Sequence, residues 1–378
     1  MISISRLEIV QTSRIIVVKV GTNVLTTGDG LLKFDRIRKL AEDLSSLMQK
    51  GRKVILVSSG AVGAGIGELG LKERPSEHRQ LQAIAAVGQT KLMQTYEDAL
   101  APYHVLPGQV LLTADDLAHR QQYLNIRNTF SSLLDYKVLP IVNENDTVSV
   151  EELHSTFGDN DRLAALVANL YAEPLLILLT DVDGLYTGDP ALPESRLIPV
   201  VDRWTSNLME MVAEKRSKRS KGGMSSKLKA AKMVTSSGGS VIIANGDDED
   251  VLKKIVSGQE TGTVFFPSRS TLARKRWIGY AVLPKGTLII DDGAANVLVN
   301  KGKSLLPVGV LSVSGKFDKG DIVSIVNTSG REIARGLSNY NLRDVAALCG
   351  KKTKDIPAIL GYQPYEEIVH RDNIQIVE

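Results

Sequence analysis

The chain has 378 residues, of which 43% are hydrophobic and 24% are charged, and its formal net charge is +3. This length allows two domains, each with its own core, while the nearly balanced charge gives no support to nucleic-acid binding. The single cysteine, Cys349, excludes an internal disulfide and a cysteine metal cluster; because no apolar run has membrane-spanning length and the N-terminus lacks a signal-peptide core, we expect a cytoplasmic protein without a membrane partner.

From about residue 14 to residue 266, short apolar runs alternate with helical patterns. The runs are rich in Val, Ile and Leu, as in strands buried on both faces of a sheet, and they cover residues 15–20, 54–57, 138–142, 175–179 and 241–244. Apolar residues three or four positions apart predict helices over 34–48, 161–170 and 225–234. Strands that alternate with helices in this way indicate an α/β fold around a mostly parallel sheet.

The pattern changes after residue 266. Residues 267–283 begin with a polar run that has no apolar periodicity, and we interpret them as a linker. Beyond the linker, short apolar pieces alternate with turn signals, and they predict strands over 287–290, 308–313, 322–326 and 332–336. The sequence therefore predicts an α/β domain over residues 1–266 and a β-rich domain over residues 284–378.

The first two predicted strands end in sequences that can approach a phosphate group. Lys19 lies near the end of the first strand and is followed by Gly21, which lets phosphate oxygens reach backbone N–H groups. The second strand runs into Ser58-Ser59-Gly60-Ala61-Val62-Gly63, where small residues lie at the edge at which parallel sheets bind ligands. Tight packing of a helix on the sheet is the structural alternative. The chain has no Walker loop.

A denser polar cluster follows the predicted strand at 138–142. It comprises Asn143-Glu-Asn-Asp146-Thr and, about a dozen residues later, Gly158-Asp-Asn160-Asp161. Carboxylates and amides packed so closely suit a zwitterion, with a carboxylate such as Asp146 for an ammonium group and amides for carboxylate oxygens. Metal binding is the competing functional interpretation, and a polar turn with a helix N-cap at Asn160 or Asp161 is the structural one.

Two further segments carry candidate binding residues. Thr180 and Asp181 directly follow the apolar run at 175–179, in the sequence Leu-Thr-Asp-Val-Asp-Gly-Leu-Tyr. Lys221-Gly-Gly-Met-Ser-Ser-Lys227 then leads into the helix predicted over 225–234. A Gly-Gly turn at a helix N-terminus binds anions through its backbone N–H groups and the helix dipole, and Lys227 adds a full positive charge.

Taken in this order, the six motifs resemble those of the glutamate 5-kinases, which belong to the amino acid kinase family. The resemblance covers the chain almost end to end, and residues from Pro284 onward resemble the PUA domain that many of these enzymes carry. It implies a three-layer αβα sandwich followed by a β-rich, PUA-like barrel domain. The implied reaction moves the γ-phosphate of ATP to the γ-carboxylate of L-glutamate, giving γ-glutamyl phosphate in the first step of proline biosynthesis.

The resemblance also implies roles for individual residues. Lys19 and Lys227 would stabilise the transferring phosphoryl group, and Asp161 would orient these two lysines. Glutamate would be held by three side chains, those of Ser59, Asp146 and Asn160. ATP would contact Lys19, Thr180, Asp181, Lys221, Gly222, Gly223, Met224, Ser225, Ser226 and Lys227.

Mg²⁺ is expected to bind mainly through ATP oxygens, so no metal site made of protein ligands is predicted. Members of the family are typically homo-oligomers, which implies a dimer or a tetramer, and the resemblance implies proline as an inhibitor at or near the glutamate site. One stretch departs from the family pattern: residues 214–221 are rich in Lys and Arg, where relatives often have Gly and Ser followed by Thr. We interpret this stretch as a solvated basic loop rather than a specific phosphate contact of Lys221.

Two other functions compete with this interpretation. A sister kinase acting on aspartate, acetylglutamate, carbamate or a nucleoside monophosphate would share the fold, but the motif at 143–147 and the β-rich tail argue against it. RNA binding is the alternative from a different class, because PUA domains elsewhere bind RNA, and it calls for a basic stripe. The tail mixes lysines such as Lys301 with acids such as Asp291, so we expect no RNA partner.

Overall fold

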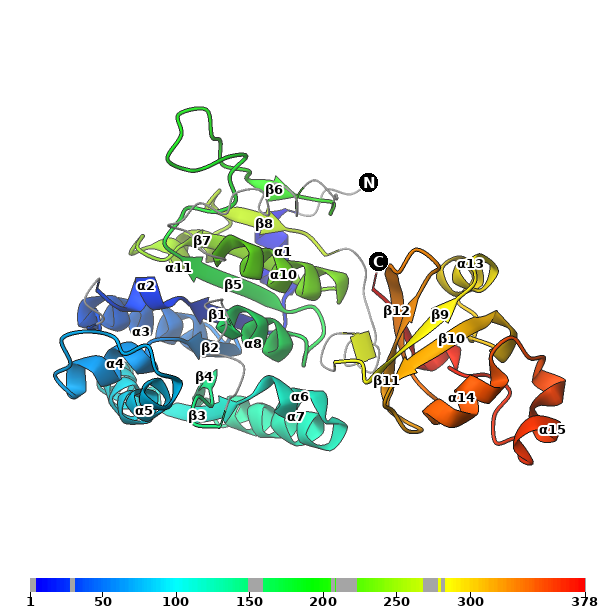
Figure 1. Cartoon of the computed structure of the whole chain (residues 1–378). Helices are drawn as coiled ribbons and strands as arrows, with labels where there is room; N and C mark the ends of the chain where they lie inside the picture. Colours follow the sequence, from blue (N-terminus) through cyan, green and yellow to red (C-terminus); the bar gives the residue numbers. More distant parts are fainter. Residues whose placement is uncertain are drawn as a thin grey trace. The chain divides into compact units, whose positions relative to one another are not determined.

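The computed structural model describes residues 5–27, 31–148, 159–204, 208, 223–267, 278–279 and 283–377 (Figure 1). The chain forms two compact units, Met1–Ser270 and Thr271–Glu378, each with its own sheet. The domain bounds that we expect from the sequence, 1–266 and 284–378 with a linker at 267–283, stay a prediction, because most of that linker lies outside the described residues. Within those residues, no helix is both long and apolar enough to cross a bilayer.

An eight-stranded sheet forms the centre of the first unit. Its order is β3-β4-β2-β1-β5-β7-β8-β6, and neighbouring strands from β3 to β7 pair in parallel, while β8 runs antiparallel to β7. The strands are β1 (Ile16–Val20), β2 (Val54–Ser58), β3 (Pro107–Leu112), β4 (Leu139–Glu144), β5 (Leu175–Thr180), β6 (Val200–Val201), β7 (Ser240–Asn245) and β8 (Thr263–Phe265). The mostly parallel sheet and the five strands that the apolar runs predict are confirmed.

Helices cover both faces of this sheet, as the three-layer fold requires (Figure 1). On one face the strands share a core with α1 (Arg6–Thr12), α3 (Phe34–Gln49), α4 (Ala61–Glu68), α5 (His78–Leu100) and α11 (Val251–Val256). Ile16, Val18 and Val20 belong to that core. Because successive side chains of a strand point to opposite faces, Lys19 points to the other face, which is covered by α8 (Asp159–Ala168) and α10 (Gly223–Ser236).

Three further helices and a 3₁₀ turn belong to the first unit. They are α2 (Thr22–Leu25), α6 (Ala114–Ala118) and α7 (Arg120–Asp135), together with the 3₁₀ turn η1 (Ala101–Tyr103). The strand β3 and the long helix α5 have no counterpart among the elements predicted from the sequence. In β3, Pro107 and Gly108 interrupt the apolar run, and most of the strand is only half-buried because it lies at the sheet edge.

Helices α4 and α5 approach each other closely through two glycines. A Cβ atom at Gly88 would lie 1.8 Å from the carbonyl oxygen of Ala61 and 2.3 Å from the amide nitrogen of Gly65. A Cβ atom at Gly65 would lie 2.0 Å from the carbonyl oxygen of Ile84. These distances are far below any real contact, so the glycines hold α5 against the helix that begins directly after Ser59 and Gly60.

Replacing Gly88 with alanine is therefore expected to lower the free energy of unfolding by about 3 kcal/mol or more, because the two helix backbones must move apart. Thermal or urea unfolding of the purified protein measures the effect. Thr90→Ala, at an exposed position of the same helix, serves as the control and should stay within about 0.5 kcal/mol of the wild type. Equal stability of Gly88→Ala and the control would contradict the close approach.

The second unit contains a five-stranded sheet in the order β10-β9-β11-β12-β13. Its strands are β9 (Gly286–Ile290), β10 (Val310–Gly315), β11 (Ile322–Val326), β12 (Glu332–Leu337) and β13 (Ile374–Ile376). Only β9 and β11 pair in parallel; the other neighbours are antiparallel. The four predicted strands are confirmed, and β13 is the strand that the apolar pattern missed.

Helices α13 (Asp292–Lys301), α14 (Leu342–Leu348) and α15 (Ile356–Leu360) pack in the core of this unit. Asp291-Asp-Gly293 is a turn signal in the sequence, but in the structure it lies at the start of a helix. The Asp291 side chain accepts a hydrogen bond from the backbone N–H of Ala294 and caps α13, so the same polar residues start a helix.

Candidate active site

The residues predicted for the site lie where four neighbouring strands end. The strands β4, β2, β1 and β5 are adjacent in the sheet and parallel, so their carboxyl ends open at one edge. Ser59 follows β2, Asp146 follows β4, Thr180 ends β5, and Lys19 is the last but one residue of β1. In open parallel sheets this edge is where ligands bind.

A buried ion triad joins β1 to the two helices on that face. Lys19 Nζ lies 2.7 Å from Asp161 Oδ1, and Lys227 Nζ lies 3.4 Å from Asp161 Oδ2. Ser226 donates its hydroxyl proton to the same Oδ2 over 2.7 Å. Asp161 is fully buried in α8 and the two lysines are nearly so. Lys19 of the first predicted motif and Lys227 of the last therefore meet on the carboxylate of Asp161. Asp161 belongs to α8 and Lys227 to α10, and these two helices are neighbours (Figure 1).

The charges within the triad shift the pKa values of Asp161 and Lys19. Burial acts to raise the pKa of Asp161, but the ammonium groups of Lys19 and Lys227 outweigh it, and the pKa lies below its usual range. Burial lowers the pKa of Lys19, and Lys227 lowers it further, although the carboxylate of Asp161 opposes both effects. One carboxylate thus faces two cations, so the triad carries an excess of positive charge that suits a polyanionic ligand.

Helix α10 presents its N-terminus beside this triad. It begins at Gly223, whose carbonyl oxygen accepts a hydrogen bond from Lys227 Nζ over 3.1 Å. Met224, Ser225 and Ser226 form its first turn and are half-buried. Lys221 and Gly222, which the resemblance assigns to ATP binding, lie outside the described residues, as does the basic stretch 214–221.

Asp181 forms a second anionic point near the lysines. It accepts hydrogen bonds from Asn23 Nδ2 over 2.8 Å and from the Thr180 hydroxyl over 3.0 Å. Burial acts to raise the pKa of Asp181, but these hydrogen bonds and the charge of Lys227 outweigh it and lower the pKa. The carboxylate is therefore fixed in its ionised form at the end of β5. Asn23 is not among the site residues predicted from the sequence.

Three side chains from separate elements meet beside Ser59. Asn160 Nδ2, at the start of α8, donates to Ser59 Oγ over 2.9 Å and to Asn143 Oδ1 over 3.1 Å. Asn143 Nδ2 in turn donates to Gln89 Oε1 of α5 over 2.8 Å. The structure therefore brings together Ser59 and Asn160, two of the three residues predicted to hold glutamate, and adds Asn143 and Gln89 to them.

Asp146 occupies the turn after β4 and is partly buried. The same turn is held by a hydrogen bond from the Asn145 N–H to the Leu112 carbonyl oxygen, which ties it to the end of β3. Asp146 thus lies at the same edge of the sheet as Ser59 and Asn160, in the turn that follows β4, and β4 is the neighbour of β2. Its role as a ligand for an ammonium group stays a prediction.

Sequence reasoning missed three polar residues of this edge: Asn23, Asn143 and Gln89. Asn143 belongs to the polar motif at 143–147 and Asn23 lies three residues after β1, so the signal for both was their place near a strand end. Gln89 has no such signal, because it lies within a long helix, and its contact to Asn143 spans 54 positions of the chain.

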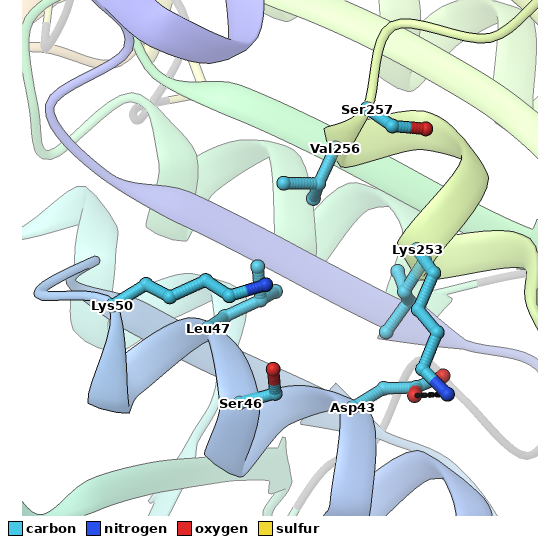
Figure 2. Close-up of a pocket in the computed structure, with 8 residues that line it drawn as sticks. Asp43, Ser46, Leu47, Lys50, Lys253, Val256 and Ser257 are labelled. Carbon is cyan, nitrogen blue, oxygen red and sulfur yellow. Dashed lines mark ion pairs between the residues drawn. The ribbon is translucent and has the colours of Figure 1, made fainter.

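A separate cavity of about 230 Å³ lies between α3 and α11 (Figure 2). Asp43 and Lys253 line it and form an ion pair of 3.7 Å. Burial raises the pKa of Asp43, although Lys39 and Lys253 oppose this effect. None of the lining residues is a predicted ATP or glutamate ligand, so this cavity is distinct from the edge that holds the triad.

Comparison with known proteins gives the family. Residues 14–245 match the amino acid kinase family and residues 286–360 match the PUA domain. The chain is 46% identical to a glutamate 5-kinase of Caldanaerobacter subterraneus subsp. tengcongensis over 365 residues, which are 96% of this chain and 98% of that protein. It is also 46% identical to those of Rhodopirellula baltica (98% of this chain, 95% of that protein) and Moorella thermoacetica (98% of each). The chain therefore belongs to the glutamate 5-kinases, a group of ATP-dependent phosphotransferases within the amino acid kinase family, and carries a C-terminal PUA domain.

Proposed function

We propose that this protein transfers the γ-phosphate of ATP to the γ-carboxylate of L-glutamate and so forms γ-glutamyl phosphate, the first step of proline biosynthesis. The observation that carries the proposal is the triad, in which Lys19 and Lys227 converge on Asp161 at 2.7 and 3.4 Å. The names of the relatives, which match almost the whole chain, support glutamate as the acceptor.

The chemistry needs charge neutralisation more than proton transfer. The attacking γ-carboxylate is already ionised at neutral pH, so no general base is required. A carboxylate oxygen forms a bond to the γ-phosphorus while the bond from that phosphorus to the β–γ bridging oxygen breaks, and ADP leaves with the electron pair. Lys19 and Lys227 offset the negative charge that builds on the phosphoryl oxygens, and Asp161 holds both ammonium groups in place.

The two subsites follow from the positions of the remaining residues. Glutamate lies against Ser59 and Asn160, with Asp146 facing its ammonium group. ATP lies across the carboxyl end of β5 and the N-terminus of α10, where Thr180, Asp181 and the residues from Gly223 to Lys227 contact it. The helix α10 has fourteen residues, so its dipole favours phosphates at its N-terminus.

Mg²⁺ enters this proposal as a companion of ATP. Within the described part of the chain, no group of three or more His, Cys, Asp or Glu side chains could hold a metal ion. Asp161 contacts the two lysines, and Asp181 at the end of β5 would meet an ATP-bound ion. Such an ion would shield the β- and γ-phosphate oxygens and keep water in its remaining positions.

Three further proposals rest on family membership. We propose that the protein assembles as a dimer or tetramer, that proline inhibits it at or near the glutamate site, and that it works in the cytoplasm.

The test is an assay that traps the acyl phosphate with hydroxylamine, run with ATP, Mg²⁺ and a panel of acceptors. Glutamate should give the hydroxamate, while aspartate and acetylglutamate should give none, and neither carbamate nor a nucleoside monophosphate should stimulate ADP release. A purified, folded protein that responds to another acceptor and not to glutamate would overturn the proposal.

A further inference from the structure

Four polar side chains form a continuous hydrogen-bonded relay from α5 to the end of β2. It runs from Gln89 through Asn143 and Asn160 to Ser59, with donor–acceptor distances of 2.8, 3.1 and 2.9 Å. Gln89, Asn143 and Ser59 are each more than nine-tenths buried. The relay therefore lies in the interior, and its last member is the serine proposed to touch glutamate.

The direction of every hydrogen bond in the relay is fixed by a backbone group. The N–H of Glu144 can only donate, and it does so to Asn143 Oδ1 over 2.9 Å. The oxygen of Asn143 is thereby identified, its amide nitrogen must face Gln89, and the atom of Gln89 that accepts must be the oxygen. Asn160 then presents its nitrogen to Asn143 Oδ1 and, with its second proton, to Ser59 Oγ.

This polarity leaves the Ser59 hydroxyl with an unused proton. Its oxygen accepts from Asn160, and among the described residues it donates to none. A hydroxyl that already accepts turns its own proton toward an incoming acceptor. At this position the expected acceptor is an anion, because Lys19 of the adjacent strand β1 belongs to a cluster with excess positive charge.

Gln89 is not explained by packing alone. Its Nε2 is buried and has no hydrogen-bond partner among the described residues, which lowers stability. A methionine would fill nearly the same space without that cost. Methionine, however, could not accept the hydrogen bond that Asn143 Nδ2 donates to Gln89 Oε1.

We propose that Gln89 is a positioning residue that tunes glutamate binding: through Asn143 and Asn160 it keeps the Ser59 hydroxyl oriented to donate to a carboxylate of the substrate. This inference rests on the proposed function and deepens it. Gln89 itself does not touch the substrate. Gly88 directly precedes Gln89 in the chain. Its close approach to Gly65 of α4 holds the first member of the relay in place.

Gln89→Met removes the acceptor and Gln89→Glu keeps an acceptor oxygen while removing the unpaired donor. In Gln89→Met, the KM for glutamate should rise about tenfold, the size expected for one lost buried hydrogen bond, while the KM for ATP stays within about twofold. Gln89→Glu should restore the KM for glutamate to within about threefold of the wild type. Thr95→Val is the control, because Thr95 is buried on the same helix and its hydroxyl donates to the backbone carbonyl oxygen of Lys91 in that helix.

Several results would overturn the inference. They are an unchanged KM for glutamate in Gln89→Met, equal rises in both KM values, or equal defects in the Met and Glu variants. If Gln89→Met does not fold, Gln89→Leu is assayed with the same expectation, and failure of both to fold would show that Gln89 serves the fold instead. A wild-type enzyme that is inactive with glutamate would defeat the proposed function before any variant is made, so the two failures are distinguishable.

Discussion

Replacing Lys227 with alanine is expected to lower kcat by about a hundredfold to a thousandfold while the KM for glutamate changes by less than about threefold. Lys227 Nζ lies 3.4 Å from Asp161 and stands at the first turn of α10, where the transferring phosphoryl group is proposed to lie. Removal of one preorganised donor from a site of developing negative charge has an effect of this size. Steady-state kinetics with glutamate and ATP varied in turn measure both constants.

A neighbouring lysine provides the matched control for this prediction. Lys229 lies two residues further along α10 and is exposed, so Lys229→Ala removes an equal charge from the same helix without touching the triad. Its kcat should stay within about twofold of the wild type, since substitutions at exposed positions away from a site have small effects. A Lys227→Ala enzyme with the turnover of the control would remove Lys227 from the phosphate-stabilising role.

Replacing Asp161 with asparagine is expected to lower the free energy of unfolding by about 3–5 kcal/mol and to abolish most activity. The amide has the same shape as the carboxylate, but it removes the counter-charge that contacts the buried ammonium groups of Lys19 and Lys227. Denaturant unfolding measures the stability and the hydroxamate assay measures the activity. Asp135→Asn, which breaks an exposed pair with Lys53, should cost less than about 1 kcal/mol.

The pH dependence gives a second check on Asp161. Its pKa is lower in the folded protein than in the unfolded chain, so the ionised carboxylate contributes stability above the unfolded value of 3.8, and this contribution is lost as the pH falls through the folded value. The stability gap between wild type and Asp161→Asn should therefore be largest near neutral pH and narrow in acid. A gap that does not change with pH would show that the charge of Asp161 is not its source.

The sequence predicted the elements with strong periodicity and the site residues that sit beside them. The runs at 15–20 and 175–179 are almost entirely apolar, as expected for strands that a helix layer covers on each face. The structure places both strands at the centre of the sheet. Lys19 is predicted as a site residue because it lies near the end of such a run, just before Gly21. Its partner Asp161 was found through its motif, while their distance of 2.7 Å is a product of the fold.

What the sequence did not reveal depends on contacts between distant segments. Helix α5 meets α4 where the backbones nearly touch at Gly88 and Gly65, and Gln89 lies inside this long helix, so no local pattern marks it as part of the site. The edge strand β3 is half-exposed and starts with Pro107 and Gly108, which reads as a turn. In the second unit, Asp291 caps a helix where local rules favoured a turn, because both structures use the same acceptor side chain.

The position of β1 in its sheet has a consequence for synthesis on the ribosome. This strand is made before the other seven, yet it lies between β2 and β5 and pairs with both. The edge of β1 that pairs with β5 stays open until residue 180 has been translated and has left the exit tunnel. The nascent chain therefore carries an apolar strand with one unpaired edge for most of the time that this unit takes to make. The sheet of this unit can therefore be completed only after β5 has left the ribosome. Before that point, the open edge of β1 is the surface that a chaperone would shield.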